Sequence, residues 1–244
     1  MRRRFIDFMD TLRGLETPDK LRDAMQLVVE DAGFKHFMCL STNDRGEVGV
    51  LTTYPPEWVD RYGEAGYADI DPTVEQAARS LSTFTWDGAF YEEHGDESVR
   101  RLFAEAREYG VRRGMAVVWD NRGGRLTGMS IVTDRPAEDF RCLVKEQGPD
   151  LQLAALYFMA HARETLGGRL PAPPAPAHSE TLNARERECL RLLAEGTPPA
   201  GIARHTGSAD AAVRARLATA MHKLGAPSPE AAAAHARERG LLSS

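Results

Sequence analysis

The chain has 244 residues, with 42% hydrophobic and 27% charged residues and a formal net charge of −5. This is the composition of a globular protein with one large domain or two smaller ones. No apolar run approaches the roughly 20 residues needed to span a bilayer, and the opening MRRRFIDFMD lacks the apolar stretch of a secretory signal. We therefore expect a cytoplasmic protein that has no membrane partner.

The three cysteines, Cys39, Cys142 and Cys189, stand singly in apolar surroundings. Their spacing fits no metal site, and an odd number leaves one thiol unpaired in any disulfide scheme. We expect three buried free thiols and no bound metal.

The first part of the chain alternates between helix and strand patterns. Apolar residues at positions 21, 24, 25, 28 and 29 predict a helix that ends at Gly33. The segments FKHFMCLST and GVLTTY predict two strands around the turn NDRGE.

Aromatic residues with polar tips come next, followed by acids. Tyr54 precedes two prolines, whereas Trp58 and Tyr62 are four residues apart and so share one face of a helix. Three interpretations compete: core residues running into a turn, a catalytic acid pair, or a pocket for a small molecule that carries an amide. Asp69 and Asp71 would point to opposite faces of an extended segment, and no nucleophile motif accompanies them, so we expect no catalytic residues and no enzyme.

The remainder of this region completes a mixed α/β pattern. ESVRRLFAEAREYG predicts a helix, GMAVVWDNRGGRLTGMSIVT a β-hairpin, and FRCLVKEQGPDLQLAALYFMAHARETL a helix that Gly148-Pro149 breaks or caps. We expect a three-layer α/β/α sandwich with a central antiparallel sheet, a fold class that commonly holds a ligand between sheet and helices.

A proline-rich segment divides the chain. We predict a first domain over 1–166, a semi-rigid linker over 167–180 (GGRLPAPPAPAHSE) and a second domain over 181–244. Residues 178–244 carry nine Lys/Arg and seven Asp/Glu, which leaves 22 and 29 for the rest of the chain. The second domain is therefore mildly basic, which favours an anionic partner.

The second domain is almost entirely helical in pattern. Helices are predicted from Asn183 to Gly196, from 199 to Gly207 and from Ser208 to Gly225, followed by one more. Two helices joined by a tight glycine-containing turn are typical of a helix-turn-helix.

Ordered motifs in this domain resemble the DNA-binding domain of LuxR-type transcription factors. The motifs are LNARERECLRLLAEG, IARHTGS and VRARLATAMHKLG, in which Glu186, Leu190 and Gly196 occupy family positions. The resemblance implies double-stranded DNA as a partner. It also implies a homodimer, since such proteins usually read two half-sites.

The first domain resembles the acyl-homoserine-lactone-binding domain of the quorum-sensing branch of this family. The likeness rests on the YP…W…Y…DPT pattern, on Trp86 and on GVRRG. It implies that Trp58 donates to the lactone carbonyl, Asp71 accepts the ligand amide N–H and Tyr54 bonds the acyl carbonyl. Ser130 is a further polar contact, and Tyr62 and Trp86 are walls. No cofactor other than this signal is expected.

The chain departs from the family at two places. In the hairpin it has Ala116 and Val118, followed by Trp119, where relatives commonly have threonine and proline. We expect this change to reshape the acyl end of the pocket, for a short, branched or aromatic group or for a different kind of ligand.

The other departure concerns DNA recognition. In the predicted third helix of the second domain, Arg214 and Arg216 flank the core stripe, with His222 and Lys223 near the end; we expect these four to contact DNA. The outer face, however, holds Ala211, Ala215, Ala218, Thr219 and His222, which is poor in base-reading side chains.

Two main function classes and a third, less supported one remain open. The first is a ligand-responsive transcriptional regulator that binds an acyl-homoserine lactone and DNA. The alternative is an antagonist that binds no DNA and pairs with another regulator of the same family. A lactone-cleaving or acyl-transfer enzyme is a third class, for which the sequence offers no nucleophile.

Overall fold

A computed structural model describes residues 8–42, 47–122, 125–173, 182, 184–206, 208 and 210–242. Most of the turn expected over 43–47 and residues 174–180 of the expected linker lie outside these residues. The chain forms two compact units: the last segment of the first unit ends at Pro173, and the second unit holds the chain from Pro174 onward together with Val59–Asp69.

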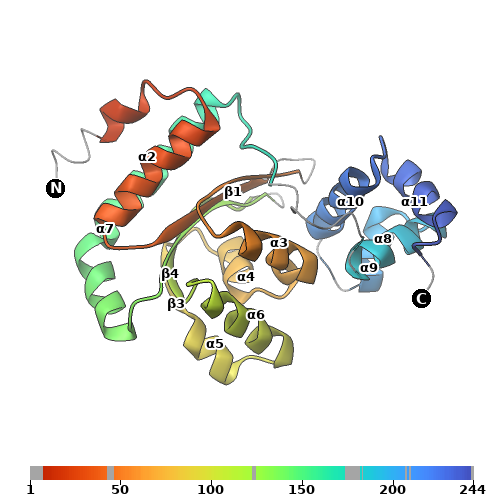
Figure 1. Cartoon of the computed structure of the whole chain (residues 1–244), viewed down its shortest axis with the longest axis horizontal. Coiled ribbons are helices and arrows are strands. Elements are labelled where there is room, and N and C mark those ends of the chain that lie inside the picture. Colours follow the sequence, from red (N-terminus) through yellow and green to blue (C-terminus); the bar gives the residue numbers. More distant parts are fainter. Residues whose placement is uncertain are drawn as a thin grey trace. The chain divides into compact units, whose positions relative to one another are not determined.

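A five-stranded antiparallel sheet forms the centre of the first unit (Figure 1). Its strand order is β2-β1-β5-β4-β3. The strands are β1 (His36–Thr42), β2 (Val48–Thr52), β3 (Phe84–Asp87), β4 (Arg113–Asp120) and β5 (Thr127–Thr133). The predicted strands and hairpin are present, whereas the short edge strand β3 was not predicted.

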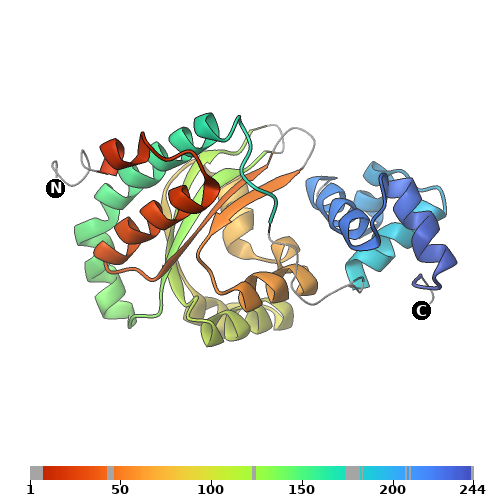
Figure 2. The same cartoon turned by 45° about the horizontal axis from the view of Figure 1, so that its top comes forward.

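Two helices lie side by side across one face of the sheet, here called the α2/α7 face (Figures 1 and 2). Helix α2 (Pro18–Asp31) begins at Thr17, whose hydroxyl accepts a hydrogen bond from the backbone N–H of Lys20, and the chain turns at Gly33 with φ of 83°. Helix α7 spans Ala137–Thr165. Between these helices and the sheet lies a continuous core that includes Phe37, Met25, Met115, Ile131, Leu151 and Phe158.

Helix α7 does not break at Pro149, contrary to the sequence prediction. Pro149 lies inside the helix and is exposed, whereas Gly148 is buried. A proline in a helix interior costs about 3 kcal/mol through a lost hydrogen bond and a steric clash. Buried side chains on both sides of it, from Phe140 to Ala162, hold the helix on the sheet and outweigh that cost.

Short helices lie against the opposite face, here called the α3–α6 face (Figures 1 and 2). They are α3 (Pro56–Ala65), the 3₁₀ turn η1 (Tyr67–Asp69), α4 (Pro72–Arg79), α5 (Gly88–His94) and α6 (Glu97–Glu108). The predicted three-layer α/β/α architecture around an antiparallel sheet is confirmed.

The second unit is all-helical. Its helices are α8 (Ala184–Ala194), α9 (Pro199–Thr206), α10 (Asp210–Leu224) and α11 (Pro229–Glu238). They share their own core, to which α10 contributes Val213, Leu217, Ala220 and Leu224. The predicted helix-turn-helix, α9 followed by α10, is confirmed.

The cysteines differ from one another in exposure. Cys39 and Cys189 are buried free thiols, as predicted, whereas Cys142 is exposed on α7, so the prediction of a third buried thiol was wrong. The face of α7 that meets the sheet includes Phe140, Leu151 and Ala155, and Cys142 lies away from it. Among the described residues, no helix is both long and apolar enough to cross a membrane.

Candidate functional site

The two faces of the sheet are packed differently. On the α2/α7 face, Phe37, Cys39 and Ile131 are at most 1% exposed and belong to the continuous core. On the α3–α6 face, Met38 and Ser130 remain partly exposed although they lie on central strands. Protein side chains therefore cover the centre of the α3–α6 face less completely.

One row of residues crosses the whole sheet on this less covered face. The antiparallel register places the members of the row directly opposite one another: Thr52, Met38, Ser130, Ala116 and Phe84. Residues paired in this way project from the same side of a sheet. Ser130 thus stands at the middle of the face.

Tyr54 and Ser130 are brought together above this row. Tyr54 follows β2, is 9% exposed, and its side chain is hydrogen-bonded to that of Ser130. Burial raises the pKa of the Tyr54 phenol, and the negative charge of Asp71 raises it further. The phenol therefore remains protonated at neutral pH and can still donate a proton.

Asp71 caps helix α4 and also faces two tyrosines. Its Oδ1 accepts hydrogen bonds from the backbone N–H of Thr73 at 2.8 Å and from the Thr73 hydroxyl at 2.7 Å. Burial, followed by the charge of Asp71, also raises the pKa of Tyr91 on α5. The charge of Asp71 therefore acts on both phenols, and Tyr54, Ser130, Asp71 and Tyr91 are here called the polar cluster. The sequence analysis missed Tyr91 because no motif marks it.

Helix α3 carries the two predicted aromatic residues one turn apart. Trp58 is 2% exposed and its ring lies 5.5 Å from that of Tyr109, centroid to centroid. Tyr62 is partly buried and its ring lies 5.9 Å from that of Tyr67. Their spacing on one helix is as the sequence predicted.

Trp86 lies on β3 directly opposite Gly114 on β4. A Cβ atom added to Gly114 would come within 2.7 Å of Trp86 Cε2, so the absence of a side chain there lets the indole lie close to the strand. Phe103 of α6 packs on the indole with a centroid distance of 5.9 Å. The buried Nε1 donates to no described atom, an arrangement that costs about 1–3 kcal/mol.

The three hairpin residues at which the chain departs from the family do not all lie on the same face of the sheet. Ala116 and Val118 lie on the α3–α6 face with Ser130, but Trp119 packs against the α2/α7 core, and the Arg163 guanidinium of α7 lies 5.8 Å from the centre of its ring. Alternation along β4 places successive side chains on opposite faces. Trp119 therefore lies away from the α3–α6 face, whereas Ala116 and Val118 lie on it.

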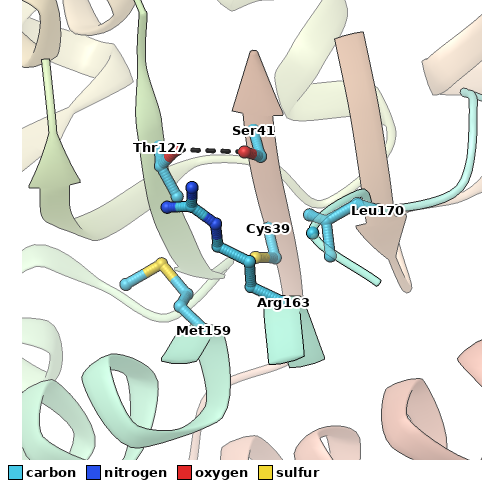
Figure 3. Close-up of a pocket in the computed structure, with 7 residues that line it drawn as sticks. Cys39, Ser41, Thr127, Met159, Arg163 and Leu170 are labelled. Atoms are coloured by element: carbon cyan, nitrogen blue, oxygen red, sulfur yellow. Dashed lines mark hydrogen bonds between the residues drawn. The ribbon is translucent and has the colours of Figure 1, made fainter. Parts of the chain in front are cut away.

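A small cavity lies on the α2/α7 side of the sheet (Figure 3). Its volume is about 10 Å³, and its lining includes Cys39, Met159, Arg163 and the hydrogen-bonded hydroxyls of Ser41 and Thr127. That volume corresponds to about one water molecule. The cavity is too small to receive an organic signal.

In the second unit, a buried ion pair joins α8 to α10. Lys223 Nζ lies 3.0 Å from Glu186 Oε2, and both side chains are 3% exposed. This explains why both residues match the family motif: they connect helices inside the domain. Lys223 is thus unsuited to the phosphate contact that the sequence suggested.

The other predicted DNA contacts lie at the surface of α10. Arg214 and His222 are exposed, as are Ala218 and Thr219. Arg216 differs from them: its side chain is 12% exposed, its guanidinium forms an ion pair with Asp69, and its Nη1 donates to Ser208 Oγ at 3.1 Å. This surface therefore presents small side chains with one arginine and one histidine.

Comparison with known families accounts for both units. Residues 17–162 match the autoinducer binding domain, and residues 180–236 match the luxR family of bacterial regulatory proteins. The first match alone spans more than half of the chain. The chain belongs to the LuxR family of quorum-sensing regulators. It is a transcriptional regulator with a DNA-binding helix-turn-helix and not an enzyme.

Relatives within the LuxR family align over most of the chain. The quorum sensing-dependent regulator RpaR of Rhodopseudomonas palustris is 25% identical, over 98% of this chain and 95% of RpaR. The transcriptional activator EsaR of Pantoea stewartii is 26% identical, over 78% and 77% respectively. Both alignments include residues of the two units.

Solved structures show the same fold. SdiA of Escherichia coli has a TM-score of 0.52 and 19% identity, with 98% of each chain covered. The N-acylhomoserine lactone dependent factor CepR2 of Burkholderia cenocepacia has a TM-score of 0.53 and 22% identity, over 64% of this chain and 94% of CepR2.

Proposed function

We propose that the first domain of this LuxR-family regulator binds an acyl-homoserine lactone on the α3–α6 face of its sheet. The observation that carries the proposal is the convergence of the Tyr54–Ser130 hydrogen bond with the Asp71 carboxylate over a face that side chains cover incompletely. A phenol, a hydroxyl and a carboxylate together provide the donors and acceptors that complement an amide and a lactone.

Each residue then has a separate role toward the ligand. Trp58 donates its indole N–H to the lactone carbonyl, Asp71 accepts the amide N–H, and Tyr54 with Ser130 binds the acyl carbonyl. Tyr62 and Trp86 form walls. The apolar side chains of this face take the acyl group, at about 0.8 kcal/mol for each buried CH₂.

A buried hydrogen-bond donor, the indole N–H of Trp86, also supports this proposal. Trp86 Nε1 is buried and has no described acceptor. Buried polar groups are nearly always satisfied, by protein, water or ligand. A ligand oxygen or an ordered water on the α3–α6 face would satisfy it.

The second domain, over 181–244 beyond the linker 167–180, would bind DNA as half of a cytoplasmic homodimer. Arg214 reaches phosphates from the exposed side of α10, and His222 reaches into the groove. Arg216 and Lys223 are left out because of their ion pairs with Asp69 and Glu186. A dimer fits the two-fold half-sites that helix-turn-helix proteins usually read.

Lactone binding and DNA binding would be coupled because the lactone shifts the populations of the states of the protein. A lactone enclosed over the sheet by the first domain, 1–166, stabilises whichever state of the protein binds it more tightly. The response of DNA binding then follows from the difference in lactone affinity between the states.

The alternative, an antagonist that pairs with another regulator, is favoured by the small side chains exposed on α10. A gel shift on genomic fragments at increasing salt separates the two functions. Several phosphate contacts predict a steep fall of affinity with salt, whereas a protein without DNA contacts gives no shifted band at any salt concentration.

The lactone site is tested by recovery of the ligand. The full chain is expressed in a host that makes no signal, with N-octanoyl-homoserine lactone added to one culture and omitted from the other. Mass spectrometry of the denatured, purified protein should find close to one lactone per chain in the first sample. Recovery of none, from soluble and folded protein, would contradict a site for this class of lactone with a medium-length acyl chain.

A further inference from the structure

Two adjacent residues with short side chains are exposed near the middle of α10. Val213 and Leu217 point into the domain core, whereas Ala218 and Thr219 are exposed together with His222. The sequence of α10, DAAVRARLATAMHKL, contains no asparagine or glutamine. The centre of this surface therefore offers methyl groups where helices that read DNA usually offer long polar side chains.

Methyl groups have a matching partner in the major groove. Arginine and lysine pair with guanine, asparagine and glutamine with adenine, and acidic side chains with cytosine; alanine and threonine methyls instead contact the C5-methyl group of thymine. We infer that Ala218 and Thr219 read thymine methyl groups and that these contacts provide much of the sequence specificity. The inference rests on the proposed function, in which α10 docks in the groove.

The charged side chains fit this division of roles. Arg214 is exposed beside the methyl surface, whereas Arg216 is engaged within the protein by Asp69 and Ser208. Phosphate contacts from arginines position a protein without reading sequence. Short side chains at the centre let the helix approach the floor of the groove, where methyl groups must come within about 4 Å of one another to count as a contact.

Methyl contacts predict a weak but definable preference. Each thymine methyl removed from contact should lower affinity by roughly two- to fivefold, from the transfer free energy of one methyl group. A bidentate arginine–guanine pair would instead discriminate by roughly five- to 150-fold. The half-site should contain at least one thymine within reach of Ala218 or Thr219.

The experiment begins with selection of duplexes from a randomised library by the full-length protein, with and without N-octanoyl-homoserine lactone. In the selected duplex, each half-site thymine is then replaced by deoxyuridine, which lacks only the C5-methyl group. A second duplex carries cytosine or 5-methylcytosine at the same position. These two bases have the same minor-groove edge, so a difference between them reports the major-groove methyl rather than groove width.

The inference predicts weaker binding of the deoxyuridine duplex and tighter binding of the 5-methylcytosine duplex than of the cytosine duplex. Thr219→Ser removes the protein methyl and keeps the hydroxyl, so it should reduce the deoxyuridine effect at one position. Arg214→Ala is the control: it should weaken binding to all duplexes by the same factor.

Two contrary results have different meanings. If the protein binds the selected duplex but is indifferent to deoxyuridine and to 5-methylcytosine, or if no thymine is selected, the methyl inference is overturned and the proposed function stands. If no duplex is recovered under either condition, the proposed DNA binding fails and the inference fails with it.

Discussion

Breaking the buried ion pair between Lys223 and Glu186 should strongly destabilise the second domain. The two groups are 3.0 Å apart and each side chain is 3% exposed. Removing one partner of a buried ion pair typically costs about 3–5 kcal/mol. In a domain of this size each kcal/mol shifts the unfolding midpoint by roughly 4–8 °C. Lys223→Met should therefore lower the midpoint of this domain by at least about 10 °C.

Scanning calorimetry of the full chain measures the effect, since the two domains can give separate transitions. The matched control is the double variant Glu186→Leu with Lys223→Met, because replacing a whole buried pair by apolar residues is often neutral or stabilising. It should recover most of the lost stability. If Lys223→Met left the midpoint unchanged while reducing the salt dependence of DNA binding by about one unit, Lys223 would be a phosphate contact and the assignment to the core would be wrong.

Three further predictions concern the first domain and the thiols. Asp71→Asn keeps a side chain that can cap α4 but removes the negative charge. Lactone affinity should therefore fall by about 1–2 kcal/mol in a titration, while the melting midpoint changes little. Equal affinities of the variant and the original protein would exclude a charged contact. Gly114→Ala forces a Cβ to 2.7 Å from the Trp86 ring and should cost about 1–3 kcal/mol, with a shift in tryptophan emission; an unaltered spectrum and midpoint would show that the indole lies elsewhere. A thiol reagent at pH 8 should label exposed Cys142 first, because burial raises the pKa of the Cys39 thiol to about 12; rapid labelling of Cys39 in folded protein would contradict its burial.

Much of the fold was predictable because local patterns and tertiary packing agree. Helix α2 follows apolar spacing and ends at a glycine, and the β4–β5 hairpin follows two β-prone runs. The helix break expected at Pro149 does not occur. Proline destabilises the helix only locally, whereas the buried face of α7 stabilises the helix over its whole length. The sequence pattern does not show whether the cost of the proline or the gain from packing is larger.

The site was predictable in its residue types but not in its geometry. Tyr54 and Ser130 are far apart in sequence, and their hydrogen bond depends on the register between β1, β2 and β5. Tyr91 belongs to the polar cluster because of the position of α5, a helix that no periodic pattern in the sequence predicts. Trp119 shows the same limit, because only the strand register reveals which face of the sheet it occupies.

The most direct test of the central claim is a thermal melt of the full chain, made in a host without signal, against homoserine lactones with varied acyl groups. A ligand at one hundred times its dissociation constant adds about 2.7 kcal/mol, which should raise the midpoint of the first domain by roughly 5–10 °C. Trp58→Phe, which removes the indole N–H but keeps an aromatic ring at the proposed site, should show a smaller shift at the same lactone concentration. A flat response across the panel from stable, folded protein would contradict a lactone site on the α3–α6 face.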